Sequence, residues 1–382
     1  MILKNGLVVD ESFTLKKCDL KIENGVIAAI AEDIPGDDAV DLSGCYILPG
    51  FIDSHMHGAM GCKLSDTNPF PDLNKITKYE ATQGVTGIAL GSTCSDFEHL
   101  LRQFDLAVKA SKETVGAKIV ALHAEGPFIN PKKKGAMDEK FILAPDCEKL
   151  DRLIAHGQGL LRLLTLAPEG EGSEEVIAYA VSKGLTVSMG HTDATYDQAR
   201  VAIAAGATQS THTFNAMRAL NHREPGILGA VLTDPAVTCE MICDHTHLHP
   251  AILRLIYRCK GADRINIISD SEHGAGIHAD HIVVDGEVRY IRDGVMLLEN
   301  GTIAGSASSM LRGVRNLLQA GIPITDVAQM AAYNPAKTLK IDHLTGSIAV
   351  GKAADLCVLD QNYEVQYTYV DGKCAYKKEI NA

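Results

Sequence analysis

The chain has 382 residues, of which 46% are hydrophobic and 22% are charged, and its formal net charge at pH 7 is -12. This balance is typical of a soluble globular protein, and its acidity argues against a nucleic-acid-binding surface, which needs a basic stripe. No apolar run approaches the ~20 residues of a membrane span. We therefore expect neither a nucleic acid nor a membrane as a partner.

The two ends of the chain share a β-rich pattern. Residues 1–49 form short apolar pieces broken by turns, and Glu23–Gly25 is a strong hairpin signal because Asn-Gly tolerates the positive φ of a tight turn. Residues 342–382 repeat this pattern, and neither end is long enough to bury a core of its own. We therefore predict one small β-sandwich domain built from residues 1–49 and 342–382.

The middle of the chain, residues 50–341, alternates apolar runs with helical stretches such as residues 98–110 and 308–320. The apolar runs lack strict alternation, which is typical of buried parallel strands in β/α units. Hairpin-like pieces at residues 281–290 interrupt the alternation, and we interpret them as an insertion. The pattern predicts an α/β fold, a (β/α)8 TIM-like barrel over residues 50–341.

The N-terminal segment and the cysteines indicate the compartment. Met1–Gly6 has no basic segment followed by an apolar core, so we expect no signal peptide. The ten cysteines form no CxxC pairs or regular spacing, which indicates reduced thiols. We therefore expect a cytoplasmic protein.

Six polar residues lie at the ends of apolar runs. His55 and His57 belong to an Asp-x-His-x-His run, and residues two apart on a strand point to the same face. One such residue is commonly a hydrogen-bonded loop group. Six together predict a site, because a barrel builds its site at the carboxyl ends of its strands. The other four are Glu125, His191, His212 and Asp270.

These residue types suit a divalent metal. Imidazoles and carboxylates bind Zn²⁺, Fe²⁺, Mn²⁺ or Co²⁺, and they do not select among these ions. The first histidine pair with Asp270 can hold one ion, and the other two histidines can hold a second with Glu125 as a bridge. A bound divalent ion lowers the pKa of its water to about 7. Asp270 can accept that water's proton and pass it to a leaving amine, so we predict hydrolysis of an amide by one or two ions per chain.

Several motifs resemble a known family. The strand-end residues and the split β-sandwich resemble the amidohydrolase superfamily over essentially the whole chain. Within it, the motifs resemble the deacetylases of 6-phosphorylated N-acetyl amino sugars. The segments that carry this narrower resemblance are His123–Phe128, Thr165–Glu169, Gly190–Ala194, Thr211–Met217 and Arg223–Gly226.

The resemblance implies a role for each predicted metal ligand. Glu125, His191 and His212 are the principal ligands, and Asp270 is the catalytic general base and acid. The histidine pair at positions 55 and 57 matches those members of the family that have a second metal site.

The resemblance also implies a sugar-phosphate pocket on Asn215, the backbone of Ala216, Arg223 and His247, completed in part across a homodimer. Arg223 suits phosphate because its guanidinium offers a planar fork of donors. On spacing alone, His245 is a rival to His247.

One position departs from the family pattern. Many members carry a histidine after a Lys-Lys-Gly segment, where it helps to polarise the acetyl carbonyl. Here the position holds Met137, which has no side-chain hydrogen-bond donor. His273 is our candidate for a replacement carbonyl donor. We interpret the nearby Lys132–Lys134 run as a solvated loop.

Three functions compete. The first is deacetylation of a 6-phosphorylated N-acetyl amino sugar, with the glucosamine compound ahead of the galactosamine compound. The second is hydrolysis of a cyclic amide or ureide by another amidohydrolase, against which Asn215 and Arg223 argue. The third is a non-catalytic sensor or scaffold, which would have no need of Asp270.

Overall fold

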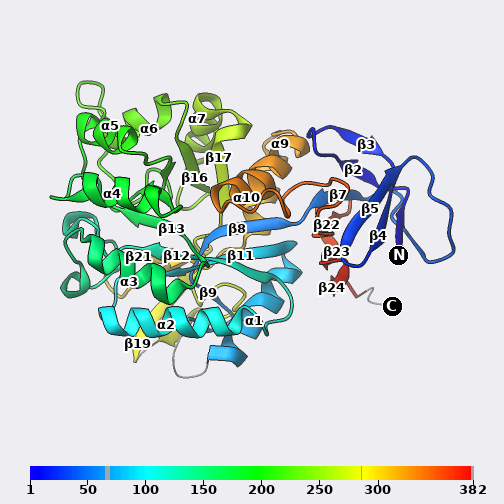
Figure 1. Ribbon diagram of the computed structural model, residues 1–382, viewed down its shortest axis with the longest axis horizontal. Coiled ribbons are helices and arrows are strands. Elements are labelled where there is room, and N and C mark those ends of the chain that lie inside the picture. Colours follow the sequence, from blue (N-terminus) through cyan, green and yellow to red (C-terminus); the bar gives the residue numbers. More distant parts are fainter. Residues whose placement is uncertain (65–68, 285, 380–382) are drawn as a thin grey trace.

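The computed structural model describes residues 1–64, 69–284 and 286–379. Helices surround a central set of parallel strands, and strands from both termini lie side by side at one end of the molecule (Figure 1). Within the described ranges, no helix has both the length and the apolar character that crossing a lipid bilayer requires.

The central strands form an eight-stranded parallel sheet that curls into a barrel. Almost every residue in these strands is buried, which is why they are continuously apolar rather than alternating. This architecture confirms the predicted (β/α)8 barrel. In the order of the sheet, the strands are β8 (Phe51–Met56), β11 (Val85–Ser92), β12 (Lys118–Glu125), β13 (Leu161–Leu166), β14 (Thr186–Met189), β15 (Gln209–Ser210), β16 (Thr238–Ile242) and β17 (Ile265–Ile268).

The helices lie around the outside of these strands (Figure 1). The helix predicted at residues 98–110 is α2, whose N-cap Asp96 accepts a hydrogen bond from a backbone N–H of the first turn at 3.0 Å. The helix predicted at residues 308–320 is α8, which is capped by Ser309. The α-helices are α1 (Pro69–Thr82), α2 (Phe97–Ala110), α3 (Cys147–Gly157), α4 (Ser173–Ser182), α5 (Tyr196–Ala204), α6 (Gly226–Thr233), α7 (Pro250–Lys260), α8 (Met310–Gln319), α9 (Ile324–Ala328) and α10 (Asn334–Thr338).

The terminal segments form two further sheets with strand orders β5-β4-β1-β6 and β24-β23-β22-β7-β2-β3. Strand β22 from the C-terminal segment pairs antiparallel with β7 from the N-terminal segment. The two sheets share a core that includes Leu3, Leu20 and Leu356, which confirms a sandwich built from both ends. The strands are β1 (Ile2–Lys4), β2 (Leu7–Val9), β3 (Leu15–Lys17), β4 (Asp19–Glu23), β5 (Val26–Ala31), β6 (Ala39–Asp41), β7 (Tyr46–Pro49), β22 (Leu356–Leu359), β23 (Val365–Val370) and β24 (Lys373–Lys377).

The predicted hairpin joins β4 to β5 in an antiparallel pair. Asn24 and Gly25 have φ values of 51° and 83°, the left-handed conformations that this tight turn requires. The domain boundaries at residues 49 and 341 stay predictions.

An antiparallel sheet follows β17, as expected for the insertion. It is built from β18 (His281–Val284), β19 (Glu287–Arg292), β20 (Val295–Leu297) and β21 (Ile303–Ser306). The N–H of Ser306 donates to the carbonyl of Asp270 at 3.0 Å, and the N–H of Glu272 donates to the carbonyl of Ser306 at 2.8 Å. These bonds attach the insertion to the segment that carries the predicted catalytic aspartate. A short hairpin of β9 (Gly58–Ala59) and β10 (Cys62–Lys63) follows the His-x-His pair.

A buried aspartate joins the barrel to the sandwich. Asp355 accepts hydrogen bonds from the Lys118 ammonium at 2.8 Å, the Thr345 hydroxyl at 2.7 Å and the Asp371 N–H at 2.9 Å. The Asp355 side chain is only 1% exposed, whereas that of Asp371, which also contacts Lys118, is 53% exposed. Burial lowers the pKa of Lys118, but the two carboxylates outweigh it and raise the pKa above its ordinary value.

We predict that Asp355→Ala lowers the free energy of unfolding by about 3 kcal/mol, because it leaves buried donors and part of a buried charge without their partner. Urea denaturation followed by circular dichroism measures the change. Asp371→Ala is the control, and it should cost less than about 1 kcal/mol because its ion pair is exposed. Equal losses in the two variants would mean that burial does not decide the strength of this contact.

Candidate metal and catalytic site

The barrel closes at the predicted site. The N–H of Asp270 donates to the carbonyl of His55 at 2.9 Å, and the N–H of His57 donates to the carbonyl of Ser271 at 2.7 Å. These bonds join the segment after β17 to the end of β8. The closure therefore holds the predicted general base against the histidine pair.

Three site residues leave their strands in the left-handed region of φ. The values are 48° for His191, 27° for His212 and 49° for Asp270. Non-glycine residues seldom adopt this conformation, and its cost of about 1–3 kcal/mol each is characteristic of functional sites. The sharp turn also explains why β15 ends at Ser210, two residues before His212.

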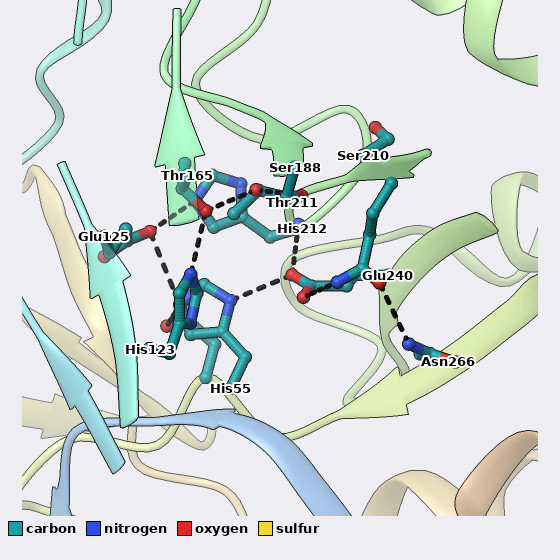
Figure 2. A network of polar contacts seen from close by, with 12 residues as sticks. His55, His123, Glu125, Thr165, Ser188, Ser210, Thr211, His212, Glu240 and Asn266 are labelled. Carbon is teal, nitrogen blue, oxygen red and sulfur yellow. Dashed lines mark hydrogen bonds and ion pairs between the residues drawn. The ribbon is translucent and has the colours of Figure 1, made fainter. Parts of the chain in front are cut away.

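Glu125, His191 and His212 form one cluster of potential ligands (Figure 2). The Nε2 atoms of both histidines lie 3.1 Å from Oε1 of Glu125, and the two Nε2 atoms lie 3.1 Å from each other. All three residues are buried. The structure therefore brings together the three residues that the resemblance implies as principal ligands.

His55, His57 and the same glutamate form a second cluster. The Nε2 atoms of the two histidines are 3.2 Å apart. Oε1 of Glu125 lies 3.4 Å from His55, and Oε2 lies 3.3 Å from His57. Oδ1 of Asp270 lies 3.5 Å from both Nε2 atoms. The carboxylate of Glu125 is thus shared by both clusters, as expected for a bridging ligand.

The hydrogen bonds behind the rings indicate that these clusters suit a cation. Nδ1 of His191 donates to the carbonyl of Lys133 at 2.7 Å, and Nδ1 of His212 donates to the carbonyl of Asn215 at 3.1 Å. Because a carbonyl only accepts, each Nδ1 carries a hydrogen, and each ring in its neutral form presents its Nε2 lone pair to the cluster. Lone pairs 3.1 Å apart repel each other unless a proton or a metal ion lies between them. The donor set therefore fits a divalent metal.

The pKa shifts within the site also indicate that it suits a cation. Burial raises the pKa of Glu125, but His55 and His191 outweigh it and hold the pKa well below its ordinary value. Burial also raises the pKa of Asp270, and His55 and His57 outweigh it and lower the pKa. The pKa of His57 rises to about 10, because contacts with Asp270 and Glu125 exceed the effect of burial. The two carboxylates thus stay ionised and hold positive charge around them, whether protons or metal ions.

Hydroxyl groups support the site from inside the barrel (Figure 2). Nε2 of His123 lies 2.8 Å from the hydroxyl of Thr165, which contacts Thr211 at 2.7 Å, and Thr211 contacts Ser188 at 2.6 Å. Burial lowers the pKa of His123 well below its ordinary value, and the charge of His55 lowers it further. His123 is therefore a neutral packing partner, and its ring meets that of His55 edge to face at 4.4 Å between centroids.

The predicted substrate residues differ in how closely the structure joins them to the site. Asn215 is next to the cluster of Glu125, His191 and His212, because its carbonyl accepts a hydrogen bond from His212. Ala216 follows directly in the left-handed region, with φ of 49°. Arg223 lies on an exposed loop, and its guanidinium has no acceptor among the described residues.

Of the two rival histidines, His247 is the one near the site. Its side chain is 4% exposed, Nδ1 lies 2.7 Å from Oδ2 of Asp244, and the charge of Asp270 helps to raise its pKa. Burial lowers this pKa, and the Asp244 carboxylate is the main opposing influence. His245 is exposed.

His273 is buried beside the segment that follows His57, because the N–H of Gly61 donates to its carbonyl at 2.7 Å. Nδ1 of its ring lies 2.8 Å from Oε2 of Glu272, and its buried Nε2 has no hydrogen-bond partner among the described residues. Burial raises the pKa of Glu272, but the hydrogen bond with His273 and the charge of His57 outweigh it and lower the pKa.

The interpretation of Lys132–Lys134 as a solvated loop is wrong for Lys133. Besides the bond from its carbonyl to His191, its ammonium donates to the carbonyl of Met217 at 3.1 Å and lies 3.6 Å from Asp193. These contacts with the Met217 carbonyl and the Asp193 carboxylate hold the loop against the carboxyl ends of the strands. Three consecutive lysines give no sign of this path.

Two carboxylates that the sequence analysis did not single out also hold the site. Glu169 accepts hydrogen bonds from the side chain of Asn130 at 2.7 Å and the N–H of Asp193 at 2.6 Å, which fixes the loop after His191. Glu240, in the middle of β16, contacts His55. The detectable signal for Glu240 was a single charge within an apolar strand.

Comparison with known proteins assigns the chain to a family. The profile of the amidohydrolase family matches residues 46–375. The chain belongs to the amidohydrolase family.

Within this family, the chain is similar to amino-sugar phosphate deacetylases. It is 34% identical over 93% of its length to N-acetylglucosamine-6-phosphate deacetylase of Vibrio furnissii, 89% of which is covered. It is 34% identical over 98% of its length to N-acetylgalactosamine-6-phosphate deacetylase of Escherichia coli O157:H7, 99% of which is covered. A mutant N-acetyl-D-glucosamine-6-phosphate deacetylase of Mycobacterium smegmatis, solved with N-acetyl-D-glucosamine-6-phosphate, superposes with a TM-score of 0.90 and 31% identity, covering 98% of this chain and 99% of that one.

We predict that Glu125→Gln removes metal as well as activity, because an amide is a poorer ligand than a carboxylate shared by two clusters. Elemental analysis after dialysis measures the bound metal. Glu80→Gln is the control, because it is the same nearly isosteric change at a buried glutamate outside both clusters, whose pKa burial raises well above its ordinary value. Full metal occupancy in Glu125→Gln would show that Glu125 is not the bridging ligand.

Proposed function

We propose that the chain is a hydrolase of a linear amide C–N bond that converts N-acetyl-D-glucosamine 6-phosphate into D-glucosamine 6-phosphate and acetate. The observation that carries this proposal is the convergence of four imidazoles on Glu125, directly beside Asp270. The similarity to deacetylases over nearly the whole chain supports the choice of substrate.

The proposed metal ligands are Glu125 with His191 and His212 for one ion, and His55 and His57 with Asp270 for a second, Glu125 being the bridge. A divalent ion bound there would polarise the acetyl carbonyl and lower the pKa of a water to about 7. Either one or two ions, and any of Zn²⁺, Fe²⁺, Mn²⁺ or Co²⁺, are consistent with these ligands.

Asp270 carries the proton in this proposal. Its carboxylate is ionised because the neighbouring histidines hold its pKa low, so Oδ1 or Oδ2 can accept the proton of the attacking water. The same oxygen then delivers that proton to the leaving nitrogen as the C–N bond breaks. The two closure bonds keep Asp270 beside the histidine pair during both transfers.

Asn215, the backbone N–H of Ala216, Arg223 and His247 form the proposed sugar-phosphate pocket. The free guanidinium of Arg223 supports a role in binding the phosphate dianion on an otherwise acidic protein.

His273 is the proposed donor to the acetyl carbonyl in place of Met137. Glu272 orients the ring through Nδ1, which leaves Nε2 without a partner in the described part of the chain and free to face the substrate. Gly135, two residues before Met137, lies close to the site: a Cβ added to it would be 3.6 Å from the ring of His191.

The ten cysteines are free thiols, which supports the proposal of a reducing compartment such as the cytoplasm. The homodimer that the resemblance implies stays a prediction.

The second candidate substrate is N-acetyl-D-galactosamine 6-phosphate, because one relative of equal identity is named for that activity. Acetate release by the purified, metal-loaded enzyme from both sugars, with and without the 6-phosphate, tests the proposal. The glucosamine phosphate should give the highest kcat/KM. Cyclic amides and ureides in the same panel test the more distant alternative, and turnover of these alone would refute deacetylation.

We predict that Asp270→Asn lowers kcat by about 10² to 10⁴-fold, because an amide cannot accept the proton that amide cleavage requires. Steady-state kinetics and elemental analysis are measured together, and the metal should be retained. Asp263→Asn, an exposed site 69% accessible just before the amino end of β17, should retain wild-type turnover. A third of wild-type activity with full metal in Asp270→Asn would remove this residue from the mechanism.

We predict that Arg223→Ala lowers kcat/KM for the phosphorylated sugar by about tenfold to a hundredfold, because a charge-assisted bond to phosphate is lost. The slow reaction of the unphosphorylated sugar should barely change. The exposed Arg258→Ala on α7 is the control for the loss of one positive charge. Equal damage to both substrates would mean that Arg223 supports its loop instead of binding phosphate.

A further inference from the structure

Glu240, on a strand of the barrel, contacts one residue from each of the two clusters of potential metal ligands. It lies in β16 and is fully buried. Oε2 accepts hydrogen bonds from Nδ1 of His55 at 2.9 Å and from the backbone N–H of His212 at 3.0 Å. Oε1 accepts from Nε2 of Gln209 at 2.6 Å. Figure 2 shows His55 between the two carboxylates of Glu125 and Glu240.

The partners of Glu240 determine which nitrogen of His55 carries its hydrogen. The amide groups of His212 and Gln209 can only donate here, so the carboxylate acts as an acceptor toward all three neighbours. Nδ1 of His55 therefore carries the hydrogen, and its Nε2 faces His57 and Glu125 in its own cluster. The same oxygen holds the backbone of His212, whose φ of 27° is the smallest of the three left-handed site residues.

We propose that Glu240 is a positioning residue that couples the two clusters of potential metal ligands. It orients the His55 ring in one cluster and the His212 backbone in the other through a single oxygen. A displacement of the carboxylate would disturb both clusters together. This inference rests on the metal-dependent function proposed above, and metal affinity tests it separately from turnover.

The orientation of Glu240 is itself fixed by hydrogen bonds on its far side. Oε1 of Gln209 accepts from the hydroxyl of Thr338 at 2.9 Å and from the amide of Asn266 at 3.3 Å. Gln209 therefore cannot exchange its oxygen and nitrogen without opposing the Asn266 donor. Its Nε2 stays directed at Glu240.

This geometry makes Glu240→Gln informative. If the new amide keeps its oxygen toward His55 and His212, its nitrogen meets the nitrogen of Gln209, and two donors oppose each other. If it turns, its nitrogen opposes Nδ1 of His55. Either arrangement moves a metal ligand without changing the size of the side chain.

Titration of the metal-free protein with Co²⁺, followed by visible absorption, tests the proposal. Two backgrounds isolate the clusters: His191→Ala removes a ligand of the His212 cluster and leaves the His55 cluster intact, and His57→Ala does the reverse. Glu240→Gln is then added to each background. We expect Co²⁺ affinity to fall about 10- to 100-fold in each background, the usual effect of losing a partner of a metal ligand. A loss confined to the His191→Ala background would show that Glu240 serves His55 alone and would overturn the coupling.

A paired exchange separates hydrogen bonding from overall charge. In the double variant Glu240→Gln with Gln209→Glu, the new carboxylate accepts from the new amide, from Asn266 and from Thr338. We expect at least a tenfold recovery of Co²⁺ affinity relative to Glu240→Gln. A folded double variant with no recovery would overturn positioning by hydrogen bonds.

Asp355→Asn is the matched control, because it converts a buried carboxylate in the sandwich to an amide. It should lower the free energy of unfolding yet keep wild-type Co²⁺ affinity. Equal loss of affinity would mean that general destabilisation explains the result. Should Glu240→Gln fail to fold by circular dichroism, Glu240→Asp takes its place: the shorter carboxylate cannot reach both His55 and the His212 N–H. Wild-type affinity in that variant would refute the proposal.

Discussion

The carboxylate of Glu125 is the contact on which the site depends. Four imidazoles from different parts of the chain meet within 3.5 Å of it or of one another. Burying such a group in an apolar barrel is costly unless charges are paired and hydrogen bonds are complete. Glu240 and the carbonyls behind the rings meet that requirement, so the polar interior extends beyond the six residues predicted at the strand ends.

Much of this arrangement could be predicted from the sequence, because the strand ends of a barrel converge whatever the exact length and register of each strand. The carboxyl ends of parallel strands converge wherever the strands are placed, so six polar residues at the ends of apolar runs were bound to meet. The sandwich was predictable for a similar reason, since two β-rich ends too short for separate cores can bury their apolar faces only against each other. The hairpin at Asn24 and Gly25 is encoded locally.

The residues that escaped prediction are those whose role depends on register or on the path of a loop. Glu240 faces His55 because β15 and β16 pair Gln209 with Thr238, and a shift of one residue would turn it outward. Lys133 reaches the site through a loop whose course is set by Met217 and Asp193. Spacing alone could not separate His247 from His245, because the burial of His247 depends on its contact with Asp244. None of these contacts leaves a periodic signal in the sequence.

The closure of the barrel has a consequence for biosynthesis. The hydrogen bonds between His55 and Asp270 join segments more than two hundred residues apart, and β7 of the sandwich needs β22 near the end of the chain. During synthesis the N-terminal ligands therefore emerge long before the residues that enclose them. The closure between His55 and Asp270 can therefore form only after residue 270 has been synthesised, and the sandwich only after β22 has.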